Sequence, residues 1–209
     1  MDNLLKSLGL QHNRPRYAPK LGYDPQAKAK MDAITDVLSS PMAGNHILFE
    51  DECDLHLLPT IRAMWMRCGK QTRIPTPGTN QKKNIFGASD IRTGSFIYQI
   101  FYRERSVEFI EFLECIASRY PTGRIHVILD NYSIHKSRAA QEWLSKHPKV
   151  KLCFRPCYKP QLNLVEKIWW PLKAAVTANR LYGLMNALID AVIAFLDSLT
   201  PCQIQTLAA

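Results

Sequence analysis

The clearest pattern along the chain is a short, largely apolar run, 125–129, that stops abruptly at Asp130 and Asn131. Pro121 and Gly123 precede the run and mark a turn. An apolar run of this length between turn signals predicts a buried central strand. Asp130 is therefore expected at the rim of a sheet, where side chains from neighbouring strands can converge on a ligand.

A second run, 46–49, repeats the pattern and leads into three consecutive acids, Glu50, Asp51 and Glu52. Successive side chains of a strand point to opposite faces, so Asp51 should face away from the two glutamates. Neighbouring strands lie about 4.8 Å apart, so Asp51 and Asp130 at matching heights could share one cation. We therefore take Asp51, rather than its neighbours, as a candidate ligand.

The remaining periodicity predicts a strand meander followed by alternating strands and helices. A short amphipathic helix should begin near residue 24. Further strands are expected over 61–67, 84–88, 95–102 and 150–154, and helices over 137–146 and from about 106, 163 and 184. Residues 71–84 contain Pro75, Pro77 and Gly78 and should form a hairpin or protruding loop with a basic stem. This order implies a mixed α/β sheet with helices on both faces.

A third acid, Glu166, stands where a predicted helix follows a strand and a loop. The N-terminus of that helix would bring Glu166 to the same rim as Asp51 and Asp130. Each acid also has a structural explanation. Asn163 and Glu166 fit a capping box, Asp130 could turn the chain into the next helix, and Asp51 could end a surface strand. Carboxylates buried together are unfavourable unless a cation compensates them, so three at one rim would indicate a metal site.

The charge of the 209-residue chain indicates what kind of partner it binds. The formal net charge is +9 and the sequence pI about 9.3, which favours an anionic partner, nucleic acid first. Prolines within 14–20 indicate an extended basic arm, which could follow a phosphate backbone or be a solvated leader. DNA contacts are expected from five basic residues: Arg14, Arg16, Lys20, Lys82 and Lys83.

Other features argue against several classes of protein. The six cysteines contain no CxxC pair, and no histidine couple accompanies Cys153 and Cys157, so a zinc site is not predicted. No signal-peptide pattern opens the chain, and we expect the cysteines to be reduced and intracellular. The longest apolar stretch, 184–199, is interrupted by polar residues and is predicted to be a core helix rather than a membrane span.

These motifs resemble the catalytic domain of DDE transposases, in the bacterial insertion-sequence branch of the mariner superfamily. The resemblance covers roughly 47–196 and rests on the combination of Asp130-Asn131 with His135 and of Leu162-Asn163 with Glu166. Supporting matches are Phe49-Glu50-Asp51-Glu52, Gly87-Ala88, Thr93-Gly94, Trp169 and Lys173. Two positions depart from the family pattern: Leu164 replaces a common proline, and Pro171 should kink or restart the helix.

The resemblance implies an RNase H-like domain over 46–200, preceded by a basic linker arm and short helix (1–45) and followed by a C-terminal tail (201–209). It also implies that Asp51, Asp130 and Glu166 bind two Mg²⁺ or Mn²⁺ ions. Three further residues would support this triad: Asn131, His135 and Asn163. His135 could instead be a structural hydrogen-bonding residue.

The activity that the resemblance implies is metal-dependent cleavage and strand transfer of insertion-element DNA, by a homodimer on transposon ends and target DNA. Residues 71–84 resemble the region where relatives clamp a second subunit. Only 45 residues precede the first catalytic strand, so we expect the N-terminal helix-turn-helix domains to be missing. The expected location is a bacterial cytoplasm, associated with the nucleoid. Two alternatives are a stand-alone nuclease of the same fold and a non-catalytic DNA-binding or dimerising remnant that interferes with full-length transposase.

Overall fold

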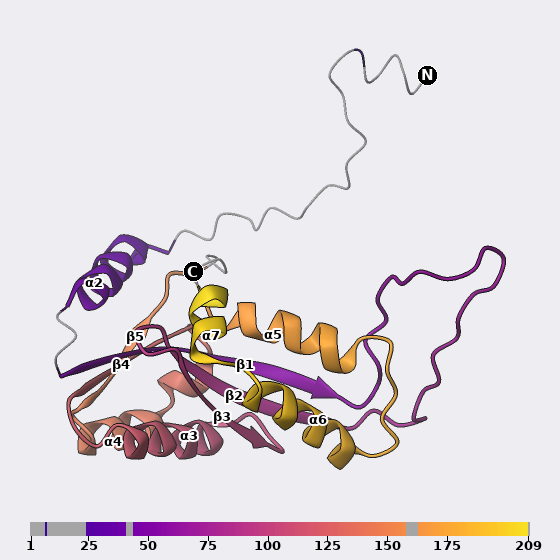
Figure 1. Cartoon of the computed structure of the whole chain (residues 1–209). Coiled ribbons are helices and arrows are strands. Elements are labelled where there is room, and N and C mark those ends of the chain that lie inside the picture. Colours follow the sequence, from indigo (N-terminus) through magenta and orange to yellow (C-terminus); the bar gives the residue numbers. More distant parts are fainter. Residues whose placement is uncertain (1–6, 8–23, 41–43, 158–162, 209) are drawn as a thin grey trace.

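The computed structural model, which describes residues 7, 24–40, 44–157 and 163–208, is built around a five-stranded sheet (Figure 1). Its strands are β1 (Asn45–His56), β2 (Lys82–Asp90), β3 (Ser95–Phe101), β4 (Arg124–Leu129) and β5 (Val150–Phe154). The order in the sheet is β3-β2-β1-β4-β5. β2 runs antiparallel to both β1 and β3, whereas β1, β4 and β5 are parallel. The mixed sheet predicted from the sequence is confirmed.

Helices cover both faces of the sheet (Figure 1). Leu48 of β1 packs into a core with α3 (Ser106–Arg119) and α4 (Arg138–Lys146). The next residue, Phe49, packs into the opposite core with four other helices, α2 (Ala27–Ser39), α5 (Glu166–Leu172), α6 (Met185–Asp197) and α7 (Pro201–Ala208). The described residues also form the 3₁₀ turn η1 (Ser133–Lys136) and the π-helix η3 (Lys173–Thr177). The predicted alternation along β1 thus divides the two cores.

β1 is longer than its parallel neighbour, and this difference creates an open notch. β1 pairs with β4 from Asn45 to Phe49, and β4 ends at Leu129. Beyond Phe49, β1 continues to His56 while paired with β2 on its other side. Extending the β1–β4 register by two residues places Asp51 opposite Asp130. Both aspartates therefore lie where the β1 edge is uncovered, and the notch is open to both faces of β1.

The loop between β1 and β2, residues 57–81, corrects one prediction. Residues 61–67 form no strand, although their side chains alternate as a strand would require. Neither side of the alternation is buried, since Trp65 on one side is fully exposed and Met64 on the other is 45% exposed. The loop protrudes from the domain (Figure 1), as predicted for residues 71–84.

The base of this loop is pinned to the chain that follows η3. The Arg62 N–H donates to Asn179 Oδ1 (2.8 Å), and Asn179 Nδ2 donates to the Arg62 carbonyl (2.9 Å). The Asn179 N–H donates to the Thr60 carbonyl (2.9 Å). Asn179 has a left-handed backbone (φ 54°), which asparagine tolerates better than most residues. The backbone groups at the start of segment 61–67 therefore hydrogen-bond to Asn179 rather than to a neighbouring strand.

The two ends of the chain also bear on the predictions. Residues 201–208, expected as a tail, form α7, and its Ile204 is buried in the core. Arg14, Arg16 and Lys20 lie outside the described residues. Within the described part of the chain, no single helix is long and apolar enough to cross a membrane.

Candidate active site

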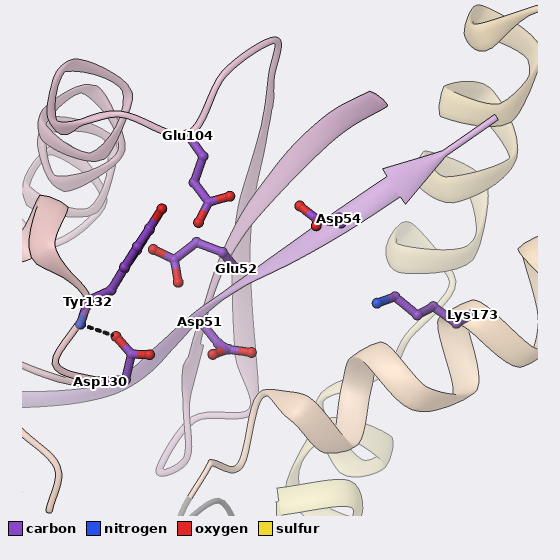
Figure 2. Close-up of a pocket in the computed structure, with 7 residues that line it drawn as sticks. All are labelled: Asp51, Glu52, Asp54, Glu104, Asp130, Tyr132 and Lys173. Atoms are coloured by element: carbon purple, nitrogen blue, oxygen red, sulfur yellow. Dashed lines mark hydrogen bonds between the residues drawn. The ribbon is translucent and has the colours of Figure 1, made fainter. Parts of the chain in front are cut away.

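An acidic pocket of about 390 Å³ opens where β1 runs past the end of β4 (Figure 2). Seven residues line it: Asp51, Glu52, Asp54, Glu104, Asp130, Tyr132 and Lys173. In Figure 2 the carboxylates of Glu52, Glu104 and Asp130 point toward one another, and Lys173 approaches from the opposite side. The fold therefore brings two of the three predicted metal ligands, Asp51 and Asp130, into one pocket.

Asp51 is largely buried and is held by three partners. Trp169 Nε1 donates to its Oδ2 (3.0 Å), the Asn163 side chain hydrogen-bonds to it, and Arg155 Nη2 lies 3.9 Å from its Oδ1. Burial raises the pKa of Asp51 to about 6, and the charge of Asp130 adds to this rise, whereas the three partners lower the pKa. A cation in the pocket would favour the ionised carboxylate.

Asp130 is half-exposed and is fixed through one of its oxygens. Its Oδ1 accepts from the Tyr132 backbone N–H (2.7 Å), and His135 Nε2 lies 3.4 Å from the same oxygen. These contacts, with His135 the largest, hold the pKa of Asp130 below its usual range. His135 is itself buried against the Phe109 ring, at 4.4 Å between centroids. The structure thus places His135 beside Asp130, while the second oxygen of Asp130 remains for a ligand.

Glu52 also approaches His135, with its Oε1 3.3 Å from Nε2. Neither carboxylate makes a well-aligned hydrogen bond to that nitrogen, which has one proton at most to share between them. Burial raises the pKa of Glu52 to about 9 and also raises that of Glu50. The ligand atoms of Glu50, Glu52 and His135 lie within 4.8 Å of one another. Glu52 nevertheless lines the same pocket as Asp51, because the notch is open to both faces of β1.

The third predicted acid, Glu166, is the first residue of α5. It is exposed and is not among the residues that line the pocket. Trp169, which contacts Asp51, and Lys173, which lines the pocket, follow Glu166 at spacings that share one helix face. α5 therefore turns the face that carries Glu166 toward the acidic pocket, one turn before Trp169. The role of Glu166 as a ligand stays a prediction.

The start and end of α5 answer two structural questions that the sequence left open. The capping-box explanation is wrong, because α5 begins without a side-chain cap and Asn163 is turned to Asp51. Pro171 does not end the helix. Helical structure continues through it to Leu172 and then widens into η3, a kind of irregularity that is frequent at functional sites.

The remaining predicted residues lie around the pocket. Asn131 Nδ2 donates to the Arg155 carbonyl (2.5 Å) and so ties the ends of β4 and β5 together. Lys82 pairs with Asp54 (2.7 Å) at the pocket lining. Lys83 is buried, with its ammonium over the Tyr102 ring. Lys82 is therefore the better placed of the two lysines for a DNA contact, and both contacts stay predictions.

Residues 46–189 match the family model described as DDE superfamily endonuclease. The chain belongs to the DDE superfamily of endonucleases. It is 37% identical over 188 residues to the Shigella sonnei "Insertion element IS630 uncharacterized 39 kDa protein". That alignment covers 89% of this chain and 55% of the relative, so the chain spans about half the length of the relative.

Solved structures share the fold of this DDE domain. The Mos1 transposase paired-end complex with the left transposon end matches at a TM-score of 0.75 and 13% identity, covering 99% of this chain and 65% of that one. The catalytic domain of Mos1 mariner transposase matches at 0.66 and 10% identity, covering 94% and 91%. At these identities the likeness concerns the fold, and it confirms the predicted RNase H-like class.

The donor set of this DDE pocket fits a divalent cation. Asp51 and Asp130 offer carboxylate oxygens, which Mg²⁺ and Mn²⁺ prefer. Each ionised aspartate also raises the pKa of the carboxyl groups beside it, and a bound cation would offset this repulsion between negative charges. Among the solved relatives are Mos1 paired-end complexes with Mn and with Mg.

Gly87 gives this DDE domain a testable packing constraint, because it lies opposite Asp51 in the β1–β2 pair. A Cβ on Gly87 would lie 2.5 Å from a ring carbon of Trp169. We expect Gly87→Ala to push the indole away from Asp51 and to lower the free energy of unfolding by about 1–3 kcal/mol, measured by urea unfolding. Gly183→Ala is the control, because a Cβ there meets nothing within 4 Å. Equal stability of the two variants would contradict this tight packing.

Several residues at the site were not assigned a role from the sequence. Arg155 follows β5 as Asp130 follows β4, so the rule that parallel strands end at one rim could have found it. Trp169 and Lys173 were part of the family resemblance, but their roles depend on which face of α5 meets the sheet. Glu52 was set aside because strand alternation separates it from Asp51, and alternation does not reveal that β4 ends early.

Proposed function

We propose that this chain is the catalytic domain of an insertion-element transposase, which cuts DNA strands and joins the freed ends to a target. The observation that carries the proposal is the meeting of Asp51 and Asp130 at one open pocket beside α5. Asp130 is half-exposed there, so a DNA backbone could reach it from solvent.

In the proposed reaction, water attacks a phosphodiester at the element end and displaces the 3′-oxygen of the neighbouring nucleotide. The freed 3′-hydroxyl then attacks a phosphodiester of the target and displaces a 3′-oxygen of the target strand. Asp51, Asp130 and Glu166 would hold two Mg²⁺ or Mn²⁺ ions. When bound, these ions would activate the attacking oxygen and stabilise the leaving oxygen.

Protein side chains would keep these acids in position for that chemistry. Trp169 and Asn163 orient Asp51, and His135 with the Tyr132 N–H orients Asp130. Lys173 faces these acids across the pocket, where its ammonium could contact a phosphate oxygen.

DNA and a second copy of the chain are the proposed partners. The net charge of +9 supports affinity for DNA, at transposon ends and in the target, and this substrate would place the protein at a bacterial nucleoid. The protruding loop supports the homodimer, because it exposes five large apolar side chains: Leu58, Ile61, Met64, Trp65 and Met66. Apolar groups gathered on a surface are typical of a protein interface.

A cleavage assay on a duplex that carries insertion-element ends tests the proposal. We expect nicks at the element end with Mg²⁺, joining of that end to a second duplex, and neither product in EDTA. DNA affinity should fall on the order of a hundredfold between 50 and 200 mM salt, since each neutralised phosphate contributes a slope of about −0.9. Cleavage of any duplex without joining would indicate a stand-alone nuclease. DNA binding without metal-dependent cleavage would indicate a non-catalytic partner.

A further inference from the structure

Two lysines from different elements meet over one amide oxygen beside the acidic pocket. Lys136 of η1 donates to Asn131 Oδ1 at 2.8 Å, and Lys30 of α2 donates to the same oxygen at 3.3 Å. The other end of the Asn131 amide donates to the Arg155 carbonyl, which fixes Oδ1 toward the lysines. The two ammonium groups are thus held close together, one residue along the chain from Asp130.

The charge of this lysine pair is only partly balanced. Lys30 pairs with Asp24 at 3.0 Å. Lys136 is exposed, and no carboxylate of the described residues lies within ion-pair distance of it. Its second contact is the Phe154 ring, with the ammonium 5.0 Å from the centroid. Two like charges over a neutral oxygen repel each other, so an anionic oxygen at this position would bind both more strongly.

We propose that Lys30 and Lys136 bind a backbone phosphate of the DNA, next to the phosphodiester that is cut at the pocket of Asp51 and Asp130. The proposal rests on the proposed function. Lysine binds phosphate as a point charge, and an oxygen of the phosphate would take the place of Asn131 Oδ1 between the two ammonium groups. The ligand is thus a phosphodiester, with no base recognised.

Asn131, whose Oδ1 the two lysines share, follows Asp130 directly in the chain. A phosphate held by the lysines would therefore lie close to the phosphodiester at the acidic pocket. Because Lys30 belongs to α2, the same phosphate would also tie α2 to the bound DNA.

The first test measures duplex affinity in EDTA, where no strand is cut, at salt concentrations from 50 to 200 mM. The double variant Lys30→Met/Lys136→Met should bind more weakly than wild type at 50 mM salt, and its salt slope should be shallower by about 0.9. Its loss of affinity over this salt range should thus be about three- to fourfold smaller than that of wild type. The control Lys28→Met/Lys146→Met removes the same charge from exposed positions on α2 and α4.

The second test locates the phosphate. Duplexes with one neutral methylphosphonate at each position around the cleavage site should show one position, next to the cut, where wild type loses affinity. The Lys136→Met variant should lose less affinity than wild type from the substitution at that same position, because only Lys30 then remains to contact the phosphate. Lys136 sits on an exposed turn, so this single variant keeps the test valid even if Lys30→Met loosens α2. Inorganic phosphate at equal ionic strength should not displace the duplex.

We call the phosphate site formed by Lys30 and Lys136 the anchor. The outcomes distinguish failure of this anchor from failure of the proposed function. If the two double variants share one salt slope while wild type binds and cuts DNA, the lysine pair is not an anchor and the transposase proposal stands. A methylphosphonate pattern that Lys136→Met leaves unchanged would overturn the anchor as well. If wild type has no affinity for DNA, the proposed function fails. Displacement of the duplex by inorganic phosphate would show an anion site that is not specific for DNA.

Discussion

Replacing Asp51, Asp130 or Glu166 by its amide is expected to lower the rate of strand cleavage by at least about a thousandfold. The amide keeps the size of the side chain but removes the charge that a divalent cation needs. Metal ions contribute several kcal/mol of charge stabilisation in such reactions, and each 1.36 kcal/mol is a factor of ten in rate. Single-turnover cleavage of an end-bearing duplex at saturating Mg²⁺ measures the effect.

Exposed acids of the same types provide the controls. Asp190→Asn on α6 and Glu111→Gln on α3 change the same charge away from the pocket and should leave the rate within about twofold of wild type. Near wild-type cleavage by Asp51→Asn or Asp130→Asn would remove that residue from the metal site. If only Glu166→Gln remained active, the third ligand would have to come from the pocket lining, where Glu52 and Glu104 are the candidates.

The order of strands and helices could be predicted because each strand carries its own boundary signals. The run 125–129 stops at Asp130, and parallel pairing then brings the acids of β1 level with the ends of β4 and β5. Asp51 and Asp130 follow from this logic without any knowledge of tertiary contacts. The convergence of these two acids is therefore a property that local sequence patterns can reveal.

Other parts of the site depend on contacts between residues far apart in the sequence. Segment 61–67 alternates like a strand, but its start is held by Asn179, which lies more than 100 positions away. Asn163 fits a helix cap by its local spacing, but its side chain instead hydrogen-bonds to the largely buried carboxylate of Asp51. Glu52 lines the pocket because β1 extends beyond the end of β4. The positions where strands end are the least certain part of a sequence-based prediction.

The metal-free pocket should make the stability of the folded protein depend on pH. Burial raises the pKa of Asp51 from 3.8 to about 6 and that of Glu52 from 4.5 to about 9, so the folded protein keeps protons that the unfolded chain releases. Their contribution to the free energy of unfolding is therefore present at pH 4 and is lost as the pH rises to about 6 and about 9. For Asp51 the loss is on the order of 3 kcal/mol. Asp130, whose pKa is lowered, acts in the opposite direction below pH 4.

Mg²⁺ should reverse this loss, and more strongly at pH 8 than at pH 5. At a concentration 100 times its dissociation constant, a ligand of the folded state stabilises by about 2.7 kcal/mol, or roughly 5–10 °C for a chain of this size. At pH 5, Asp51 is mostly protonated, so the cation must displace a proton and the shift should fall to about half. Thermal unfolding in EDTA and in Mg²⁺ at the two pH values measures both effects.

The double variant Asp51→Asn/Asp130→Asn should lose the Mg²⁺ shift and be more stable than wild type in EDTA at pH 8, because it removes two interacting charges. An unchanged midpoint in millimolar Mg²⁺ at pH 8, or a larger shift at pH 5, would show that these aspartates do not form the metal site.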